Sequence, residues 1–355
     1  MNQSVYSALK PFRFPGQIEA LAAGRRAAPV HVRIKPTNVC NHGCYFCAYR
    51  NDGLSLGEDM VLRDKIPPEK MFEIVDDLIA MGVKAVTFSG GGEPLIYPHL
   101  AEVVNRLGAA GIKVATLTNG SRLLGKVADA LAVHATWVRV SIDGWDGPSY
   151  AAYRKVKETE FDQVMENLAA FAARRSRCAL GASIIVDKTN ARHVFELCGK
   201  LKACGVRHAK ISPCILSNDG AANNAYHAPF RDVVRAEIGR ARALDDADFK
   251  VVDHYHVMEE SFSKCYATCP FSRMLTIIGA DCNVYACQDK AYTKSGTLGS
   301  IKSRSFREFW FSDECDAALR AIDPRRTCRH HCVADEKNRA LVDYLSIDPA
   351  HAAFV

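Results

Sequence analysis

Short runs of β-forming residues alternate with amphipathic segments along most of the chain after residue 30. The runs are rich in valine, isoleucine, threonine and aromatic residues, which favour strands. They predict strands at 30–35, 85–89, 113–118, 137–142, 180–186 and 208–212. Between them, apolar residues recur every three or four positions, which is typical of helices with one buried face. These helices are predicted over 67–82, 99–111, 161–175 and 191–205.

Regular alternation of strands and helices predicts a parallel sheet with right-handed crossover connections. Six such units are too few to close an eight-unit barrel. The expected fold is therefore α/β, with a partial (β/α)6 TIM-like barrel. Functional side chains should gather at the carboxyl ends of its strands, where the βα loops meet.

The pattern changes beyond residue 218, and we predict four regions. They are an N-terminal extension (1–29), the barrel core (30–218), a helical connection containing a strand-like FKVVD (219–264), and a small cysteine-rich α+β domain (265–355). In the last region, TIIGADCNVYAC has two β-rich runs around a turn, which indicates a hairpin.

The chain has 355 residues, 14 of them cysteine, and a formal net charge of +6. Its first residues lack the apolar core of a signal peptide, and no segment reaches the length of a membrane-spanning helix. We therefore expect a cytoplasmic protein without membrane contact, whose clustered cysteines bind metal and do not form disulfides. Lysine and arginine are scattered, so nucleic acid is not an expected partner, whereas a mildly basic surface would suit an anionic substrate.

Three cysteines follow the first predicted strand in a C-x3-C-x2-C pattern: Cys40, Cys44 and Cys47. Thiolates are the ligands of iron–sulfur clusters, and a [4Fe–4S] cluster takes one ligand per iron. Three thiolates would leave one iron open, and an open position distinguishes a catalytic metal site from a closed one. A structural zinc with His42 as fourth ligand is the alternative, although its place between two of the cysteines would strain a tetrahedral centre.

This loop, with Phe46 before its last cysteine, resembles the signature of the radical S-adenosylmethionine (SAM) enzymes. The resemblance implies that the open iron binds SAM and that the reduced cluster cleaves it to methionine and a 5′-deoxyadenosyl radical. It also implies an external one-electron donor of the flavodoxin or ferredoxin type. Residues 30–215 fit the partial barrel of that family.

The ends of the second and third predicted strands carry further residues that the resemblance assigns. SGGGEPL after the second strand resembles the GGE motif, which implies that Gly91, Gly92 and Glu93 position the SAM ammonium group. The third strand ends in TNG, which makes Asn119 a cofactor-binding candidate.

The resemblance also assigns residues of the fourth and fifth strands. It makes Ser141 and Asp143 candidates for the SAM ribose and carboxylate region, with a role as helix caps or turn formers as the alternative. Ser183, and the backbone of ISPC at the end of the sixth strand, are candidates to flank the adenine.

A second set of cysteines lies near the C-terminus, where GTLGSI followed by SFREFW resembles the SPASM and twitch domains of radical SAM enzymes. The resemblance implies one auxiliary [4Fe–4S] cluster, with zinc at the same residues as the alternative. Its ligands would be one of Cys265 and Cys269, together with Cys287, Cys328 and Cys332.

The expected function is that of a radical SAM oxidoreductase or epimerase, acting on a small molecule such as a sugar, nucleoside or aminoglycoside. Only 39 residues precede Cys40, which disfavours a leader-binding domain and hence a peptide substrate. Cys214 and Cys282 are candidate hydrogen-atom donors to a substrate radical. The alternatives are a peptide- or protein-modifying maturase and, in another class, a zinc-stabilised binding or regulatory protein.

Overall fold

The computed structural model describes residues 6–255, 262–352 and 354. One sheet runs through them in the order β10-β9-β8-β1-β2-β3-β4-β5-β6-β7. The six strands predicted for the barrel form its centre, all parallel and in chain order. They are β1 (His31–Ile34), β2 (Ala85–Phe88), β3 (Lys113–Thr118), β4 (Ala135–Ser141), β5 (Ala179–Val186) and β6 (His208–Pro213).

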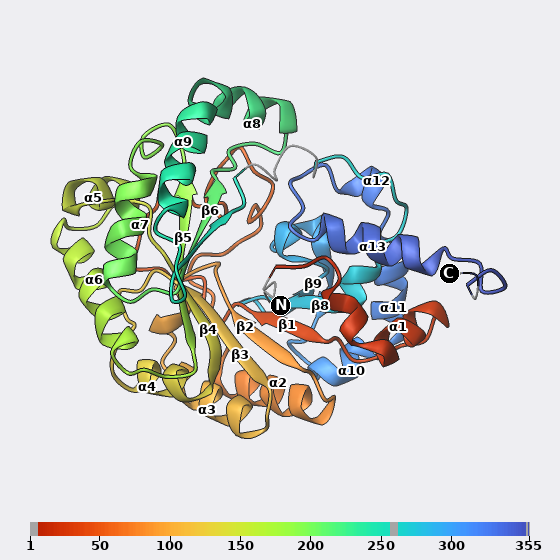
Figure 1. The fold of residues 1–355 in the computed structure, drawn as a ribbon. Coiled ribbons are helices and arrows are strands. Elements are labelled where there is room, and N and C mark those ends of the chain that lie inside the picture. The colour runs from red at the N-terminus through yellow and green to blue at the C-terminus, as the bar shows by residue number, and fades with distance from the viewer. Residues whose placement is uncertain (1–5, 256–261, 353, 355) are drawn as a thin grey trace.

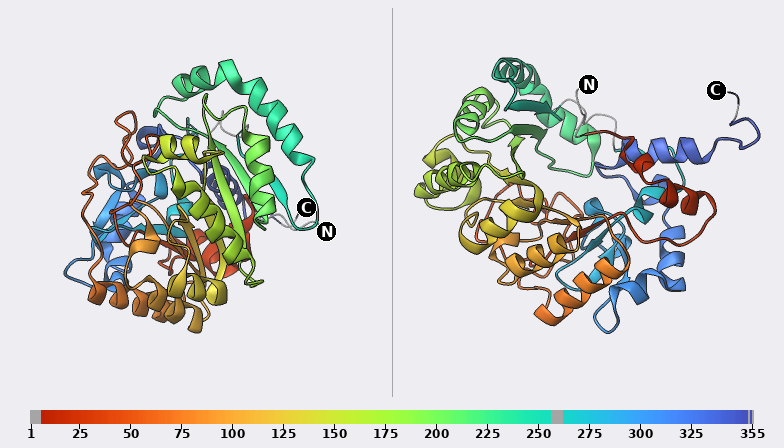
Figure 2. Two further views of the ribbon diagram at one scale, coloured as in Figure 1. Left: turned by 90° about the vertical axis from the view of Figure 1, so that its left-hand side faces the viewer. Right: turned by 60° about the horizontal axis from the view of Figure 1, so that its bottom comes forward.

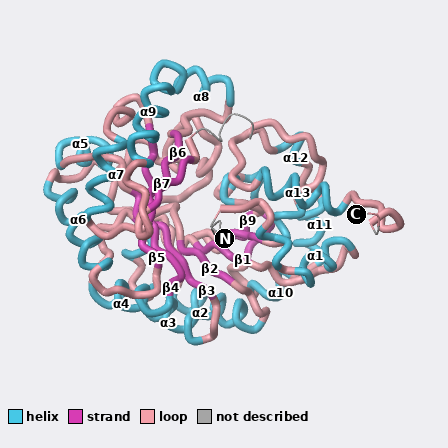
Figure 3. Tube along the Cα trace, viewed as in Figure 1, coloured by secondary structure: helices cyan, strands magenta, loops and turns pink. Residues whose placement is uncertain are grey.

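Helices cover the outer face of these strands, so the strands curve as an inner layer within a ring of helices (Figure 1, Figure 3). The helices are α2 (Pro68–Ala80), α3 (Leu100–Ala109), α4 (Gly125–His134), α5 (Gly147–Arg154), α6 (Thr159–Ala172) and α7 (Val194–Ala203). The predicted partial (β/α)6 barrel is confirmed, and Figure 2 shows from two further sides that its strands do not close a full circle.

Alternation along each strand separates the two faces of the sheet. Val32 and Ile34 of β1 are fully buried in the core that packs against the helices. The intervening His31, Arg33 and Lys35 therefore lie on the inner face. The same alternation occurs in β4, where Val138 and Val140 face the helices and Arg139 and Ser141 face inward, and in β6, where Lys210 faces inward.

The connection after β6 adds a seventh parallel strand. It contains α8 (Gly220–His227), α9 (Arg231–Arg242) and β7 (Lys250–Asp253), which pairs with β6. The strand-like FKVVD noted in the sequence thus extends the barrel sheet beyond the six expected strands.

The C-terminal segment continues the same sheet on its other side. Strand β8 (Leu275–Ile278) pairs in parallel with β1, and β9 (Asn283–Tyr285) and β10 (Thr297–Ser300) follow in antiparallel order. Strands β8 and β9 are the hairpin expected from the sequence. The remaining helices are α1 (Pro15–Ala22), α10 (Phe306–Trp310), α11 (Asp313–Arg320), α12 (Pro324–Thr327) and α13 (Asp335–Leu345).

Short 3-10 turns complete the described part. They are η1 (Lys10–Arg13), η2 (Pro94–Ile96), η3 (Ala228–Phe230), η5 (Pro270–Arg273), η6 (Gln288–Lys290) and η7 (Lys294–Gly296). None of the helices within the described residues combines the length and apolar content needed to cross a membrane.

Candidate active site

The three-cysteine loop leaves the carboxyl end of β1. Cys40, Cys44 and Cys47 are partly buried and free of disulfides. The backbone N–H of His42 donates to Cys40 Sγ at 3.4 Å, and Arg154 Nη1 donates to Cys44 Sγ at 3.6 Å. Such donors stabilise thiolates, which is the form that binds iron. The loop therefore has the donor chemistry of a cluster site.

The His42 ring turns toward α5 and α6. It stacks edge-on with Tyr150 at 6.1 Å, and its Nε2 lies 3.4 Å from Glu160 Oε1. Burial, followed by the nearby Arg154, lowers the pKa of this ring to about 3. Its contacts are thus with these two helices.

The glycine motif after β2 is docked on the backbone of the cysteine loop. The N–H of Gly92 donates to Thr37 O, and the N–H of Glu93 donates to Val39 O, both at 2.9 Å. A Cβ on Gly92 would lie 1.9 Å from Val39 O. Gly91 has φ +81°, a left-handed conformation that favours glycine. The two loops can meet this closely only because neither residue has a side chain.

The Glu93 carboxylate is buried and held by the end of β3. Oε1 accepts from Thr118 Oγ1 at 2.6 Å and from the Leu95 N–H at 3.0 Å, while Oε2 accepts from the Asn119 N–H at 2.7 Å. Burial raises the pKa of Glu93, and these donors act against the rise. Thr118, which the sequence analysis did not assign, fixes the direction of this carboxylate.

Asn119 joins β3 to the cysteine loop. Its Nδ2 donates to Asn41 Oδ1 at 2.9 Å, and Asn41 Nδ2 donates to Ser121 Oγ at 2.8 Å. Asn41 lies inside the C-x3-C spacing, so this small ring of amides orients the loop between Cys40 and Cys44. Neither Asn41 nor Ser121 was predicted, because asparagine and serine are common in any loop.

Asp143 lies in a buried ion pair below the loop. One carboxylate oxygen pairs with Arg154 Nη2, and the other accepts from the Ile185 N–H at 2.6 Å. The Arg154 guanidinium also lies over the Phe46 ring, 5.4 Å from its centroid. Burial opposes the charge of Arg154, but the facing Asp143, with Cys44 and Tyr150, raises its pKa. Arg154 therefore connects the predicted Asp143 to Cys44.

The aromatic residues of the loop rest on the end of β5. The hydroxyls of Tyr45 and Tyr153 both donate to the carboxylate of Asp187, the latter at 2.5 Å. Phe46 packs edge-on against both tyrosine rings. Asp187 was missed in the sequence because a single carboxylate after a strand carries no distinctive spacing.

Ser141 and Ser183 are neighbours across β4 and β5, since they are partners in the strand register. The same register continues from Ser183 to Lys210 on β6. The two serines predicted near SAM are thus brought into one row on the inner face.

Lys35 links the cysteine loop to the C-terminal segment. It is fully buried, and its Nζ donates to Tyr49 Oη at 2.5 Å, Gly90 O at 2.6 Å and Gln288 Oε1 at 3.2 Å. Burial, and then the charge of Arg33, lower the pKa of this amine well below its usual range. The sequence signal that could have found it is the alternation in VHVRIK, which places Lys35 on the same face as His31 and Arg33.

Four cysteines of the second set, Cys269, Cys287, Cys328 and Cys332, lie close to one another. The charges of Cys269, Cys328 and Cys332 act on Cys287, which is buried and has a raised pKa, mainly because of burial. Asn338 Nδ2 donates to Cys269 Sγ at 3.0 Å. Cys265 is exposed.

The two candidate thiols lie in different places. Cys214 follows β6 and is buried, close enough to Asp187 and Asp143 for their charges to act on it. Cys282 lies in the turn between β8 and β9, within the apolar core and near Lys70 and Lys302. Both thiols follow the carboxyl end of a strand, but Cys214 lies near Asp143 and Asp187, whereas Cys282 is packed in the apolar core.

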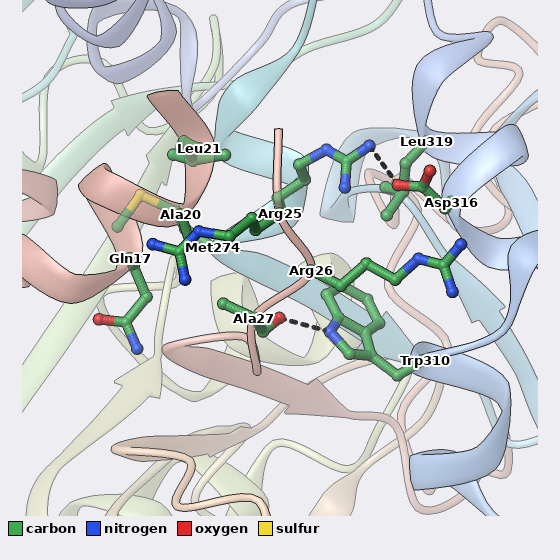
Figure 4. A pocket seen from close by; sticks show the side chains of 11 residues that line it. Gln17, Ala20, Leu21, Arg25, Arg26, Ala27, Met274, Trp310, Asp316 and Leu319 are labelled. Carbon is green, nitrogen blue, oxygen red and sulfur yellow. Dashed lines mark hydrogen bonds and ion pairs between the residues drawn. The ribbon is translucent and has the colours of Figure 1, made fainter. Parts of the chain in front are cut away.

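Within the described residues, no three histidine, cysteine or carboxylate side chains converge tightly enough to hold a single metal ion. A pocket does open between α1 and the C-terminal helices (Figure 4), where Trp310 Nε1 donates to Ala27 O at 2.8 Å. Ala27 precedes β1 and Met274 precedes β8, so this pocket lies at the amino ends of the strands. The cysteine loop lies at their carboxyl ends.

A partial α/β barrel with three cysteines on its first βα loop defines the class of protein. Residues 34–201 match the model of the radical SAM superfamily. These residues therefore form a radical SAM domain. This family uses a [4Fe–4S] cluster and SAM as cofactors.

Relatives of this chain act in different reactions. It is 28% identical over 180 residues to a GTP 3′,8-cyclase of Ectopseudomonas mendocina, a match that covers 49% of this chain and 50% of the relative. It is 27% identical over 203 residues to the dTDP-4-amino-4,6-dideoxy-D-glucose ammonia-lyase of Streptomyces venezuelae, covering 53% of this chain and 39% of the relative. The chain thus spans about half of these relatives or less.

The fold extends over nearly the whole chain in a solved structure. SuiB of Streptococcus suis, bound to the precursor peptide SuiA, superposes with a TM-score of 0.62 over 94% of this chain and 79% of SuiB. The sequence identity is 14%, so the likeness concerns the fold.

The Asp143–Arg154 pair yields a stability prediction. Changing Arg154→Ala leaves the Asp143 carboxylate buried without its partner, which should lower the free energy of unfolding by about 3–5 kcal/mol. Urea unfolding of anaerobic protein with matched iron content measures this loss. The double variant Arg154→Ala/Asp143→Asn should recover part of it.

A matched control is Arg106→Ala, which removes a surface ion pair with Asp76. Its cost should be at most about 1 kcal/mol. An Arg154→Ala variant no less stable than Arg106→Ala would contradict the assignment of the buried pair.

Proposed function

We propose that this protein reductively cleaves SAM and uses the resulting radical to remove hydrogen from a small molecule, such as a sugar, nucleoside or aminoglycoside. The reaction outcome would be oxidation or epimerisation. The observation that carries the proposal is the three-cysteine loop at the carboxyl edge of the barrel, docked on the Gly91–Gly92–Glu93 motif.

The cluster ligands would be Cys40, Cys44 and Cys47, with the fourth iron left to SAM. When bound, cluster and SAM supply one-electron cleavage of the sulfonium and a carbon radical able to abstract hydrogen. Arg154 would keep Cys44 in place, and Asn41 would set the loop between the first two ligands.

The SAM ammonium group would lie near Gly91, Gly92 and Glu93. Since the Glu93 carboxylate accepts three hydrogen bonds from the protein, its orientation is fixed before SAM binds. Ser141 and Ser183 would face the ribose and adenine from one row of the sheet, and Asn119 and Phe46 would border the site. Asp143 would act through Arg154.

A small-molecule substrate is supported by the names of the relatives by sequence, a GTP cyclase and a dTDP-sugar ammonia-lyase. The peptide-binding SuiB is related in fold at 14% identity. Modification of a peptide or protein is the second candidate, and that structural likeness is the observation that favours it.

The C-terminal segment would bind an auxiliary [4Fe–4S] cluster through Cys269, Cys287, Cys328 and Cys332, as a SPASM/twitch-like module. Cys269, Cys328 and Cys332 lie close enough to Cys287 for their charges to act on it, whereas Cys265 is exposed, which favours Cys269 as the first ligand. Electrons would come from an external donor of the flavodoxin or ferredoxin type.

Cys214 would donate hydrogen to the substrate radical. Burial raises its pKa to about 12, so Sγ keeps its proton at neutral pH. Transfer of that hydrogen atom would form the product C–H bond and leave a thiyl radical, which one electron from the external donor and one proton would restore to the thiol.

The cleavage reaction is tested on anaerobically reconstituted protein incubated with SAM and dithionite. The wild type should form 5′-deoxyadenosine and methionine, and Cys40→Ala, Cys44→Ala or Cys47→Ala should abolish both products. Cys204→Ala, outside both cysteine sets, should retain them. A reconstituted wild type that leaves SAM intact, or binds zinc in place of iron, contradicts the proposal.

The auxiliary cluster is tested by iron content. The wild type should hold about eight irons per chain, and Cys287→Ala or Cys269→Ala about four. Cys315→Ala, a buried core cysteine, should keep all eight. Four irons in the wild type, with or without zinc, would argue against the second cluster.

The role of Cys214 is tested by turnover in deuterated water. Deuterium should enter the product carbon, and Cys214→Ala should abolish this incorporation while 5′-deoxyadenosine still forms. Cys282→Ala and Cys198→Ala should behave like the wild type. Unchanged deuterium incorporation in Cys214→Ala would end this assignment.

A further inference from the structure

Three cationic side chains project onto the inner face of the barrel from separate strands. Arg33 lies on β1, Arg139 on β4 and Lys210 on β6, each between residues that face the helices. Lys210 is in register with Ser183 and Ser141, and Arg139 lies two residues before Ser141. The three cations thus begin at the proposed SAM row and continue toward the amino ends of the strands.

The described residues offer these cations no acidic partner. Among the described residues, neither Arg33, Arg139 nor Lys210 has a carboxylate within ion-pair distance. Arg33 Nη1 donates to Gln288 Oε1 at 3.3 Å, and Arg139 Nη1 donates to Tyr6 Oη at 3.2 Å. The Nε atoms of both arginines are buried without a hydrogen-bond partner.

The positive charges act on one another. Burial, and then the charges of Arg139, Arg33 and Lys337, lower the pKa of Lys210 to about 7. Burial and Arg139 also lower the pKa of Arg33, while Tyr49 and Asp289 oppose this.

Two imidazoles in the same region respond to these cations. Burial, followed by the charges of Arg139 and Lys210, lowers the pKa of His208 to about 4. Burial, Lys210 and Arg139 also lower the pKa of His254 to about 4, although the charge of Asp253 opposes this. Among the described residues, Asp289 offsets this field at Arg33 and Asp253 offsets it at His254.

Arg33, Arg139 and Lys210 are partly buried, and like charges removed from water are costly unless a counter-charge joins them. Arginine forks and a lysine amine are the groups that bind phosphate oxygens most strongly. We propose that Arg33, Arg139 and Lys210 bind the phosphate group or groups of the substrate, which is therefore a phosphate-bearing small molecule such as a nucleotide. This inference rests on the proposed function, because it places the reacting carbon above the cations and beside SAM.

Equilibrium binding tests the inference without turnover. Cluster-loaded protein is titrated anaerobically with GTP, glucose 1-phosphate, tripolyphosphate and guanosine, using calorimetry. At least one phosphate-bearing probe should bind, and Lys210→Gln and Arg139→Gln should each weaken it about 10- to 100-fold. Guanosine should bind more weakly than GTP. Lys113→Gln, an exposed lysine at the start of β3, should change the affinity less than twofold.

The probes also distinguish which class of phosphate-bearing molecule the site prefers. GTP binding more tightly than tripolyphosphate supports a nucleotide, and a preference for glucose 1-phosphate supports a sugar phosphate. The inference is overturned if every phosphate probe needs millimolar concentration or more to bind. It is also overturned if the wild type, Lys210→Gln and Arg139→Gln bind the probes with equal affinity.

Thermal unfolding provides a second readout. Lys210→Met removes one of three repelling charges, so it should raise the melting temperature of the anion-free protein and reduce the increase caused by the bound probe. If Lys210 has only a structural role, Lys210→Met should lower the melting temperature of the anion-free protein and leave the probe-induced increase unchanged. That result would overturn the inference even where Lys210→Gln folds poorly.

The two proposals fail separately. Formation of 5′-deoxyadenosine is measured on the same preparations. Cleavage of SAM without phosphate binding rejects the cation site and leaves the proposed function standing. Phosphate binding by protein that cannot cleave SAM rejects the proposed function alone.

Discussion

The active-site edge depends on one close contact between two backbones. Gly92 and Glu93 donate to carbonyls of the cysteine loop, and the position of Gly92 has no room for a Cβ atom. This contact fixes the loop after β1 relative to the loop after β2. The carboxylate of Glu93 then reaches the end of β3, and Asn119 returns from there to Asn41. Three consecutive strand ends are thereby joined around the cysteines by backbone and amide hydrogen bonds, which need only short side chains.

The sequence predicted the elements that repeat and missed those that depend on tertiary contacts. All six barrel strands were predicted from their β-forming runs, whereas α4 between β3 and β4 was not among the predicted helices. FKVVD was predicted to be strand-like, but its pairing with β6 could not be predicted, because it depends on how the whole sheet curves. The pairing of β8 with β1 could not be predicted either, because about 240 residues separate the two strands and no local sequence pattern encodes their register.

The candidate site shows the same division. Cysteine spacing and the glycine motif are local signals, so Cys40, Cys44, Cys47, Gly92 and Glu93 could be named as candidates from the sequence. Their supporting residues could not. Arg154 ends α5 and Asp187 follows β5, and each is one charged residue among many in the sequence. Only the fold brings Arg154 to Asp143, and Asp187 to the two tyrosines.

The continuity of the sheet through β8 gives the two cysteine sets a shared support. Because β8 pairs with β1, the chain after β9 passes the inner side of β1 with Cys287, Gln288 and Asp289 in sequence. Gln288 there accepts from both Lys35 and Arg33. Lys35 in turn donates to Tyr49, two residues after Cys47, and to Gly90 beside the glycine motif. A single buried amine thus touches the first cysteine loop, the glycine motif and the residue after Cys287. Any shift of the C-terminal segment would leave this amine buried without part of its hydrogen bonding, so the position of one cysteine set constrains the other.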